Sequence, residues 1–267
     1  MTILISNDDS WGAKGLNVLI AAMRQLGDVV VVAPETPQSG MSSAVSFNNP
    51  LYLKHIKDEA AQDDLHSLSV YTCSGTPADC VKMGMQVLMR DRCPDLVCAG
   101  INHGDNSTVN ARYSGTMGAV FVGIENNIPA IGFSICDHEP DADFSQFEPY
   151  LVPLTKMLYY TSDGEPYTKS TDRLCWNINA PKGKIEGFRF TRQARGYWTE
   201  EMTETQDEQG VACHKLGGYF VDTEPEATDT DQHALRSGFI SVCPTTIDLT
   251  YKGVSNPERS ETFSTIV

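Results

Sequence analysis

Hydrophobic residues in the first half of the chain follow two alternating patterns. Short apolar runs such as Thr2–Ser6 and Asp28–Pro34 are typical of parallel strands that are covered on both faces. Between them, apolar residues recur every three or four positions, as on one face of an amphipathic helix. These residues are Leu16, Leu19, Ile20, Met23 and Leu26. The alternation predicts an α/β fold with a doubly wound, mostly parallel sheet.

The same alternation continues through the next hundred residues. We predict strands at Leu68–Cys73, in "PDLVCAGIN" and in "IPAIGFSI". One helix is predicted to begin after Thr76, an N-cap residue followed by Pro77, and another after Ser114. Residues 44–56, "AVSFNNPLYLKHI", alternate in hydrophobicity and predict a small hairpin.

The pattern changes after the first 143 residues. A helix is predicted over Gln146–Tyr160, followed by strands near Leu174–Ile178 and Phe188–Arg195. A hairpin is predicted in "VACHKLGGYFVDT", and a short helix returning to a strand in "TDQHALRSGFISVCPTTIDLT". We therefore predict an α/β core that carries the site in residues 1–143. Residues 144–267 would complete this core and add a β-rich extension that serves oligomerisation.

Composition and charge narrow the possible partners of the chain. It has 267 residues, 40% hydrophobic and 21% charged, as in ordinary globular proteins. The formal net charge of −15 argues against a stable nucleic-acid partner, because phosphate contacts need a basic surface. The eight cysteines include no CxxC pair, which favours reduced, hydrophobe-like thiols. Neither a signal peptide nor an apolar run of about 18 residues is present, so we expect a cytoplasmic protein without membrane association.

Polar side chains follow three of the predicted strands. Asp8 and Asp9 come directly after the first strand, Ser39 lies in the loop after the second, and Asn102 ends "DLVCAGIN". The carboxyl ends of parallel strands share one edge of a sheet, so these side chains are expected to meet. Two carboxylates, a hydroxyl and an amide oxygen form a set that suits Mg²⁺ or Mn²⁺. A cation would also explain why two adjacent carboxylates are tolerated after an apolar strand.

The rest of this predicted edge suits a phosphate group. Ser114, Gly115 and Thr116 would present hydroxyl and backbone N–H groups at a helix N-terminus, which is a ready anion site. Gly40 and Gly104 would let the backbone approach an anion closely. Together with the cation, these elements predict metal-assisted hydrolysis of a phosphate ester.

Six segments give the sequence a specific resemblance. In chain order they are "ILISNDDSWGAKGLNVL", "VVAPETPQSGMSSAVS", "SGTPADCVKMG", "PDLVCAGINHGDN", "YSGTMGA" and "GFISVCPTTIDLT". This set resembles the SurE survival-protein family of 5′/3′-nucleotidases. The resemblance implies a Rossmann-like core with a C-terminal hairpin and tail exchanged between subunits of a homodimer or homotetramer. It also implies one divalent metal ion per subunit and hydrolysis of nucleoside 5′- and 3′-monophosphates.

The family's site residues can be carried over by position. Its metal ligands fall on Asp8, Asp9, Ser39 and Asn102, and its phosphate contacts on Gly40, Asn106, Ser114, Gly115 and Thr116. Two positions depart from the family pattern: Ser10 replaces a glycine, and Gln38 replaces a basic residue. Serine would strain the turn if its φ is positive, and the lost charge would weaken binding of more anionic substrates. Neither change removes a ligand, so we expect an active enzyme.

Asp8 and Asp9 are the predicted catalytic residues. The hypothesis is an in-line attack on phosphorus by water or by Asp8 itself, with the Ser114–Thr116 amides stabilising the equatorial oxygens. The sequence identifies no general acid, and we interpret His103 as a loop residue rather than a ligand.

Three other functions are alternatives to this enzyme. A signalling receiver would need an acceptor Asp where this chain has Asn102. A nucleotide-binding module without catalysis differs from the enzyme only in lacking turnover. A phosphatase acting on polyphosphate or RNA ends would share the chemistry, although the acidic charge argues against long polyanions.

Overall fold

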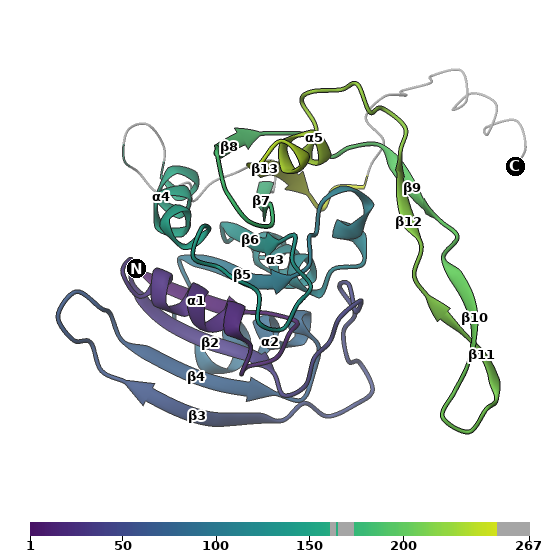
Figure 1. Ribbon diagram of the computed structural model, residues 1–267. Helices are drawn as coiled ribbons and strands as arrows, with labels where there is room; N and C mark the ends of the chain where they lie inside the picture. The colour runs from purple at the N-terminus through teal and green to yellow at the C-terminus, as the bar shows by residue number, and fades with distance from the viewer. Residues whose placement is uncertain (161–163, 165–173, 250–267) are drawn as a thin grey trace, which may run out of the picture.

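A computed structural model describes residues 1–160, 164 and 174–249 of the chain. The strands of its main sheet are β1 (Thr2–Ser6), β2 (Asp28–Pro34), β3 (Leu53–Glu59), β4 (Leu68–Cys73), β5 (Leu96–His103), β6 (Ala130–Ile135), β7 (Leu174–Ala180), β8 (Gly187–Phe190) and β13 (Phe239–Thr246). Within the described residues these nine strands have the order β3-β4-β2-β1-β5-β6-β7-β13-β8 (Figure 1). The run from β4 to β7 is parallel, whereas β3 and β13 pair antiparallel with β4 and β7. This confirms the predicted α/β class with a mostly parallel sheet.

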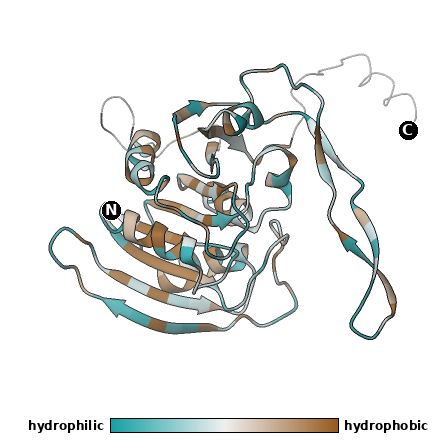
Figure 2. Cartoon of the chain, viewed as in Figure 1, coloured by the Kyte–Doolittle hydropathy of each residue, from teal (hydrophilic) through white to brown (hydrophobic). Residues whose placement is uncertain are grey.

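Helices cover both faces of this sheet. They are α1 (Lys14–Met23), α2 (Pro77–Met83), α3 (Gly115–Glu125), α4 (Glu148–Tyr159) and α5 (Asp231–Arg236), with a π-helical turn at Gly84–Leu88 and a 3-10 turn at Thr108–Arg112. One apolar cluster joins the sheet to α1 and α4, and a second joins it to α2 and α3. The hydropathy colouring shows the consequence, since the central strands are brown and the edge strand β3 is largely teal (Figure 2).

The first strand shows why the chain alternates as it does. Ile3 and Ile5 belong to the cluster beneath α1, whereas Leu4 belongs to the opposite cluster. All three side chains are fully buried, so the three central positions of β1 must be apolar. The polar residues of β1, Thr2 and Ser6, stand at its two ends, and charged residues follow only after the strand.

Three predicted strands coincide with β1, β2 and β4, but the predicted hairpin over residues 44–56 is wrong. Only β3 forms there, and its partner is β4 rather than a neighbouring segment. Residues 44–52 contain no strand; instead, the hydroxyl of Thr76 at the start of α2 donates to the carbonyl of Ala44 at 2.6 Å. Val45 and Leu51 pack against the apolar core from an irregular segment, which accounts for part of the alternation.

A second predicted hairpin, within residues 211–223, is also wrong. Both of its segments lie on the returning limb of a longer arm, which projects away from the sheet in Figure 1. The arm pairs β9 (Gly196–Thr199) with β12 (Tyr219–Asp222), and β10 (Met202–Gln206) with β11 (Ala212–Leu216). Its turn lies at Asp207–Gly210, where the amide of Gly210 donates to the carbonyl of Asp207 at 3.0 Å.

The limits of the predicted halves stay a prediction. Strands β7, β8 and β13 follow residue 143 and extend the same sheet as the strands before it, and α4 packs on that sheet beside α1. The predicted C-terminal tail exchange falls on residues 250–267, which lie outside the described residues. Among the residues that are described, no helix is both long and apolar enough to cross a membrane.

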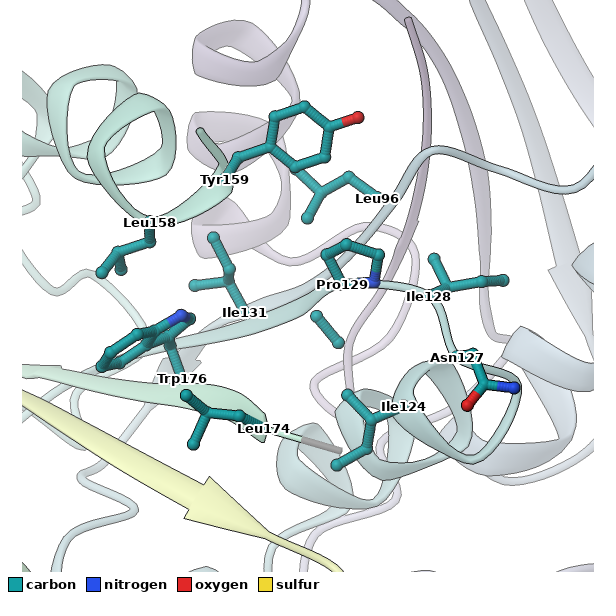
Figure 3. Close-up of a pocket in the computed structure, with 11 residues that line it drawn as sticks. Leu96, Ile124, Asn127, Ile128, Pro129, Ile131, Leu158, Tyr159, Leu174 and Trp176 are labelled. Atoms are coloured by element: carbon teal, nitrogen blue, oxygen red, sulfur yellow. The ribbon is translucent and has the colours of Figure 1, made fainter. Parts of the chain in front are cut away.

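An apolar pocket lies at the amino-terminal edge of the sheet. Leu96 and Leu174, the first residues of β5 and β7, line it together with Tyr159 and Trp176 (Figure 3). Because these strands are parallel, this pocket is at the opposite edge from Asp8 and Asn102. It is therefore separate from the predicted site.

Glycine is required where α1 approaches β5. A Cβ atom on Gly15 would lie 2.1 Å from the carbonyl oxygen of Ile101, whereas one on Gly12 would have no neighbour within 4 Å. We predict that Gly15→Ala lowers the free energy of unfolding by about 2 kcal/mol, because backbone must move to relieve the overlap. Gly12→Ala should change it by less than about 0.5 kcal/mol in urea denaturation. Equal stability of the two variants would contradict this packing.

Candidate metal and phosphate site

The predicted site residues gather where β1, β2 and β5 end and α3 begins. The loop after β2 is joined to the end of β1 by the amide of Gln38, which donates to the carbonyl of Asp8 at 2.7 Å. Helix α3 approaches the same residue so closely that a Cβ atom on Gly115 would lie 2.8 Å from the Asp8 Cβ. Separate elements thus converge on Asp8.

Asp8 carries a buried carboxyl group. Asp8 is only 3% exposed, and Thr116 Oγ1 donates a hydrogen bond to Asp8 Oδ1 at 2.5 Å. The pKa of the Asp8 carboxyl is raised to about 6: burial is the largest cause, the neighbouring charge of Asp9 also raises it, and the hydrogen bond from Thr116 opposes both. A cation held against both carboxylates would offset this desolvation and repulsion.

Asp9 is held by β5. Its Oδ2 accepts hydrogen bonds from the backbone amide and from the Nδ1 atom of His103, both at 3.0 Å. The imidazole packs edge-on against Phe144, with ring centroids 5.3 Å apart. His103 Nε2 is buried and has no hydrogen-bond partner among the residues that the structure describes. His103 is therefore the last residue of β5 rather than a loop residue, and it orients Asp9. That His103 is not a metal ligand stays a prediction.

The loop that carries Ser39 is exposed at its tip. Ser39 and Gly40 are both solvent-accessible, and Gly40 has a φ of 77°, in the left-handed region that favours glycine. Ser10, on the facing turn, has a φ of 84°. The serine that replaces the family's glycine thus stands in a strained conformation, at a cost of about 1 kcal/mol. Gln38, the second departure, has its side-chain amide 3.3 Å from Thr36 Oγ1.

Asn102 presents an amide beside this acidic pair. Its Nδ2 donates to the carbonyl of Gly104 at 2.7 Å, which fixes the orientation of the amide group. Gly104 has a φ of 103°, in the left-handed region that favours glycine; that it lets the backbone approach an anion stays a prediction. Since His103, the next residue, contacts Asp9, Asn102 lies at the same edge as the two carboxylates.

Asn106 is fixed by buried amides that the sequence reasoning did not identify. Its backbone amide donates to Asn179 Oδ1 at 2.7 Å, and its Nδ2 donates to Ser134 Oγ at 2.8 Å. Asn177 donates to the carbonyl of Asn106 at 2.7 Å. The sequence does contain a signal for these contacts: two asparagines stand at alternate positions of the buried strand "WNINA". Buried amide groups need hydrogen-bond partners, so such a pair indicates a polar contact inside the fold.

The rest of this loop is held by the C-terminal part of the chain. Thr108, at a φ of 53°, donates its backbone amide to Asp231 Oδ2 at 2.7 Å. Asp231 Oδ1 also accepts from the amide of Ala194 at 2.9 Å, and burial raises the pKa of this carboxyl. Trp198 Nε1 donates to Asn110 Oδ1 at 2.8 Å. The sequence alone indicated none of these three contacts.

Helix α3 begins as predicted. Ser114 is its N-cap, and its hydroxyl accepts a hydrogen bond from the amide of Met117 at 3.0 Å. The hydroxyl of Thr116 is used by Asp8, so the first-turn backbone N–H groups, which have no intrahelical partner, are the donors left for an anion. Whether Ser114, Gly115 and Thr116 contact phosphate stays a prediction.

The chemistry of these donors fits a hard divalent cation. Asp8 and Asp9 supply carboxylates, Asn102 an amide oxygen and Ser39 a hydroxyl, as Mg²⁺ and Mn²⁺ prefer. No group of three or more His, Cys, Asp or Glu side chains in the described part of the chain could hold a metal. A metal would therefore need neutral oxygen ligands, and the predicted set contains two.

The fold and the site define an α/β protein that gathers carboxylates, amide oxygens and a helix N-terminus at the carboxyl edge of a parallel sheet. The model of one family, "Survival protein SurE", matches residues 3–200. The chain belongs to this family, as its six motifs predicted.

Named relatives and a solved structure agree over almost the whole chain. The chain is 42% identical to "5'-nucleotidase SurE" of Bacteroides fragilis over 249 residues, which are 93% of this chain and 92% of that protein. It is also 42% identical to the protein of that name in Flavobacterium psychrophilum, over 93% of this chain and 92% of the relative. A crystal structure of the SurE protein from Aquifex aeolicus superposes with a TM-score of 0.74 and 29% identity, covering 100% of this chain and 99% of that one.

The hydrogen bond from Thr116 should set the metal affinity of Asp8. We predict that Thr116→Val weakens Mn²⁺ binding about tenfold, because the ligating carboxylate loses the donor that orients it. Thr116→Ser keeps the hydroxyl and should bind Mn²⁺ as the wild type does. Calorimetric titration without phosphate would measure both variants, and an unchanged Thr116→Val affinity would contradict this role.

Proposed function

We propose that the protein is a metal-dependent phosphomonoesterase that hydrolyses nucleoside 5′- and 3′-monophosphates to nucleoside and phosphate. The observation that carries this proposal is the buried Asp8 carboxyl, which lies against the start of α3 and is followed in the chain by Asp9. Relatives more than 40% identical over nine-tenths of the chain are named 5'-nucleotidase SurE, which supports the nucleotidase activity. The broad class of substrate follows from those names, whereas 3′-monophosphates rest on the resemblance alone.

The chain's own residues would bind and orient the ester. We infer that Asp8, Asp9, Ser39 and Asn102 hold one Mg²⁺ or Mn²⁺ ion. When bound, this ion would polarise the phosphoryl group and supply an activated water. The backbone N–H groups that open α3 would lie against the equatorial oxygens as negative charge develops on them. Gly40 would let the loop after β2 approach the phosphate without a side chain in between.

Two other functions stay as alternatives. A nucleotide-binding module would bind the same ligands through the same groups but release no phosphate. A phosphatase for polyphosphate or RNA ends would use the same chemistry on longer polyanions. The net charge of −15 disfavours the latter, because a long polyanion would be repelled beyond the metal site.

The decisive test is phosphate release from nucleoside 5′- and 3′-monophosphates with EDTA, Mg²⁺ or Mn²⁺. We expect metal-dependent release that Asp8→Asn lowers by about 100-fold or more, because the variant loses a charged metal ligand. Asp28→Asn is a matched control, since Asp28 is exposed at the amino end of β2. Metal-dependent binding without any release would favour the binding module, and full activity of Asp8→Asn would refute the assigned metal site.

We also propose that the protein is a cytoplasmic homodimer or homotetramer that associates through its arm. The eight cysteines are all unpaired, as expected in a reducing compartment. Met202 and Leu216 are paired across β10 and β11, and they are 65% and 74% exposed. Large apolar side chains exposed together on a projecting ladder are typical of a surface that is covered by another chain.

Charge on this apolar pair should disrupt association. We predict that the double variant Met202→Glu, Leu216→Glu has a smaller mass in solution than the wild type, because the acids cannot be buried between subunits. Thr203→Glu lies on the opposite face of β10 and should leave the mass unchanged. Light scattering coupled to size exclusion would measure the masses, and a wild type of single-chain mass would exclude this assembly.

A further inference from the structure

The loop that carries Ser39 is fastened to the first turn of α2. Asp79 Oδ1 accepts a hydrogen bond from the amide of Ser46 at 3.1 Å, and Asp79 Oδ2 accepts one from the hydroxyl of Ser46 at 2.8 Å. Beside them, Thr76 Oγ1 donates to the carbonyl of Ala44 at 2.6 Å. The side chains of the N-cap residue Thr76 and of Asp79 therefore hold two residues of this loop, Ala44 and Ser46.

The same two side chains also cap α2. The amide of Thr76 donates to Asp79 Oδ2 at 3.0 Å, and the amide of Asp79 donates to Thr76 Oγ1 at 3.2 Å. Asp79 is 2% exposed, and a Cβ atom on Gly75 would lie 2.6 Å from its carboxylate. The glycine before the cap thus leaves room for a buried carboxylate that accepts three donors.

Consecutive turns connect this anchor to the site. The amide of Ala44 donates to the carbonyl of Met41 at 3.0 Å, and the amide of Met41 donates to the carbonyl of Gln38 at 3.3 Å. The amide of Gln38 then donates to the carbonyl of Asp8 at 2.7 Å. Ser39 lies inside this continuous series of hydrogen bonds, between the anchored end and Asp8.

The loop is also pressed against α3. The amide of Ser42 donates to the carbonyl of Tyr113 at 3.0 Å. A Cβ atom on Gly118 would lie 2.1 Å from the carbonyl oxygen of Ser42, so the loop backbone rests directly on the helix. With one side on α3 and its far end on Asp79, the loop has few ways to move relative to Asp8.

We propose that Asp79 is a positioning residue for the metal site: by fastening Ser46 and, with Thr76, Ala44, it sets the place of Ser39 relative to Asp8. It contacts no ligand itself. This inference rests on the proposed metal site, to which Ser39 contributes its hydroxyl. Loss of the anchor should weaken metal binding while leaving the carboxylates of Asp8 and Asp9 in place.

Direct Mn²⁺ binding tests this role without relying on turnover. The signal of free Mn²⁺ in electron paramagnetic resonance would be titrated against the wild type, Asp79→Asn and Ser46→Ala. We expect the Mn²⁺ dissociation constant to rise about tenfold in Asp79→Asn and less in Ser46→Ala, which keeps the backbone bond. Ser46→Thr retains the hydroxyl donor and should restore wild-type affinity.

A matched control lies at the other edge of the sheet. Ser67 Oγ donates to Asp28 Oδ1 at 2.7 Å, a serine–aspartate pair of the same kind at the amino ends of β2 and β4. Ser67→Ala should leave the Mn²⁺ dissociation constant unchanged. Should Asp79→Asn fail to fold, as far-UV circular dichroism would reveal, Ser46→Ala and Ser46→Thr decide the question.

The outcomes separate this inference from the proposed function. Wild-type Mn²⁺ binding with equal affinity in folded Asp79→Asn and Ser46→Ala would overturn the positioning role and leave the metal site intact. Weaker binding in Ser67→Ala equal to that in Ser46→Ala would overturn it as well, since the effect would not depend on the anchor. A wild type that binds no Mn²⁺ would remove the metal site and this role together.

Discussion

A carboxyl group buried at the end of β1 is the constraint on which the rest of the site depends. Asp8 is desolvated and stands next to a second acid, so the fold must surround the pair with donors. It does so from separate elements: Thr116 on α3 donates to Asp8, and His103 on β5 donates to Asp9. The order of β1, β5 and the helices is thus also the arrangement that makes two adjacent charges tolerable.

The fold was predictable where burial acts on every residue of an element. Strands β1, β2 and β4 coincide with mostly apolar runs, because the sheet is covered on both faces and most of their side chains are buried. The strand pairing could not be predicted where it depends on which distant strand a segment pairs with. Residues 44–56 and 211–223 look like hairpins, but their partners lie on β4, β9 and β10, and local alternation cannot specify a distant partner.

The same distinction applies to the residues of the candidate site: some could be placed from the sequence, and others could not. Strand-end residues such as Asp8 and Asn102 could be placed from sequence, since parallel strands end at one edge. The groups that hold the loops could not, because Asn177 and Asp231 are far along the chain from the residues they fix. The conditional expectation for Ser10 was met by its positive φ, and only a backbone conformation could decide it.

The hydrogen bonds of the loop around Asn106 also have a consequence for synthesis, because their partners are translated long after the loop itself. A nascent chain that has exposed α3 already contains the carboxylates and the hydroxyl that orients Asp8. The backbone of Asn106 and Thr108, however, gains its partners only when Asn177, Asn179 and Asp231 emerge. The groups of the acidic half of the site are thus all present in the first half of the chain, whereas the partners that fix the loop beside it come from residues translated later.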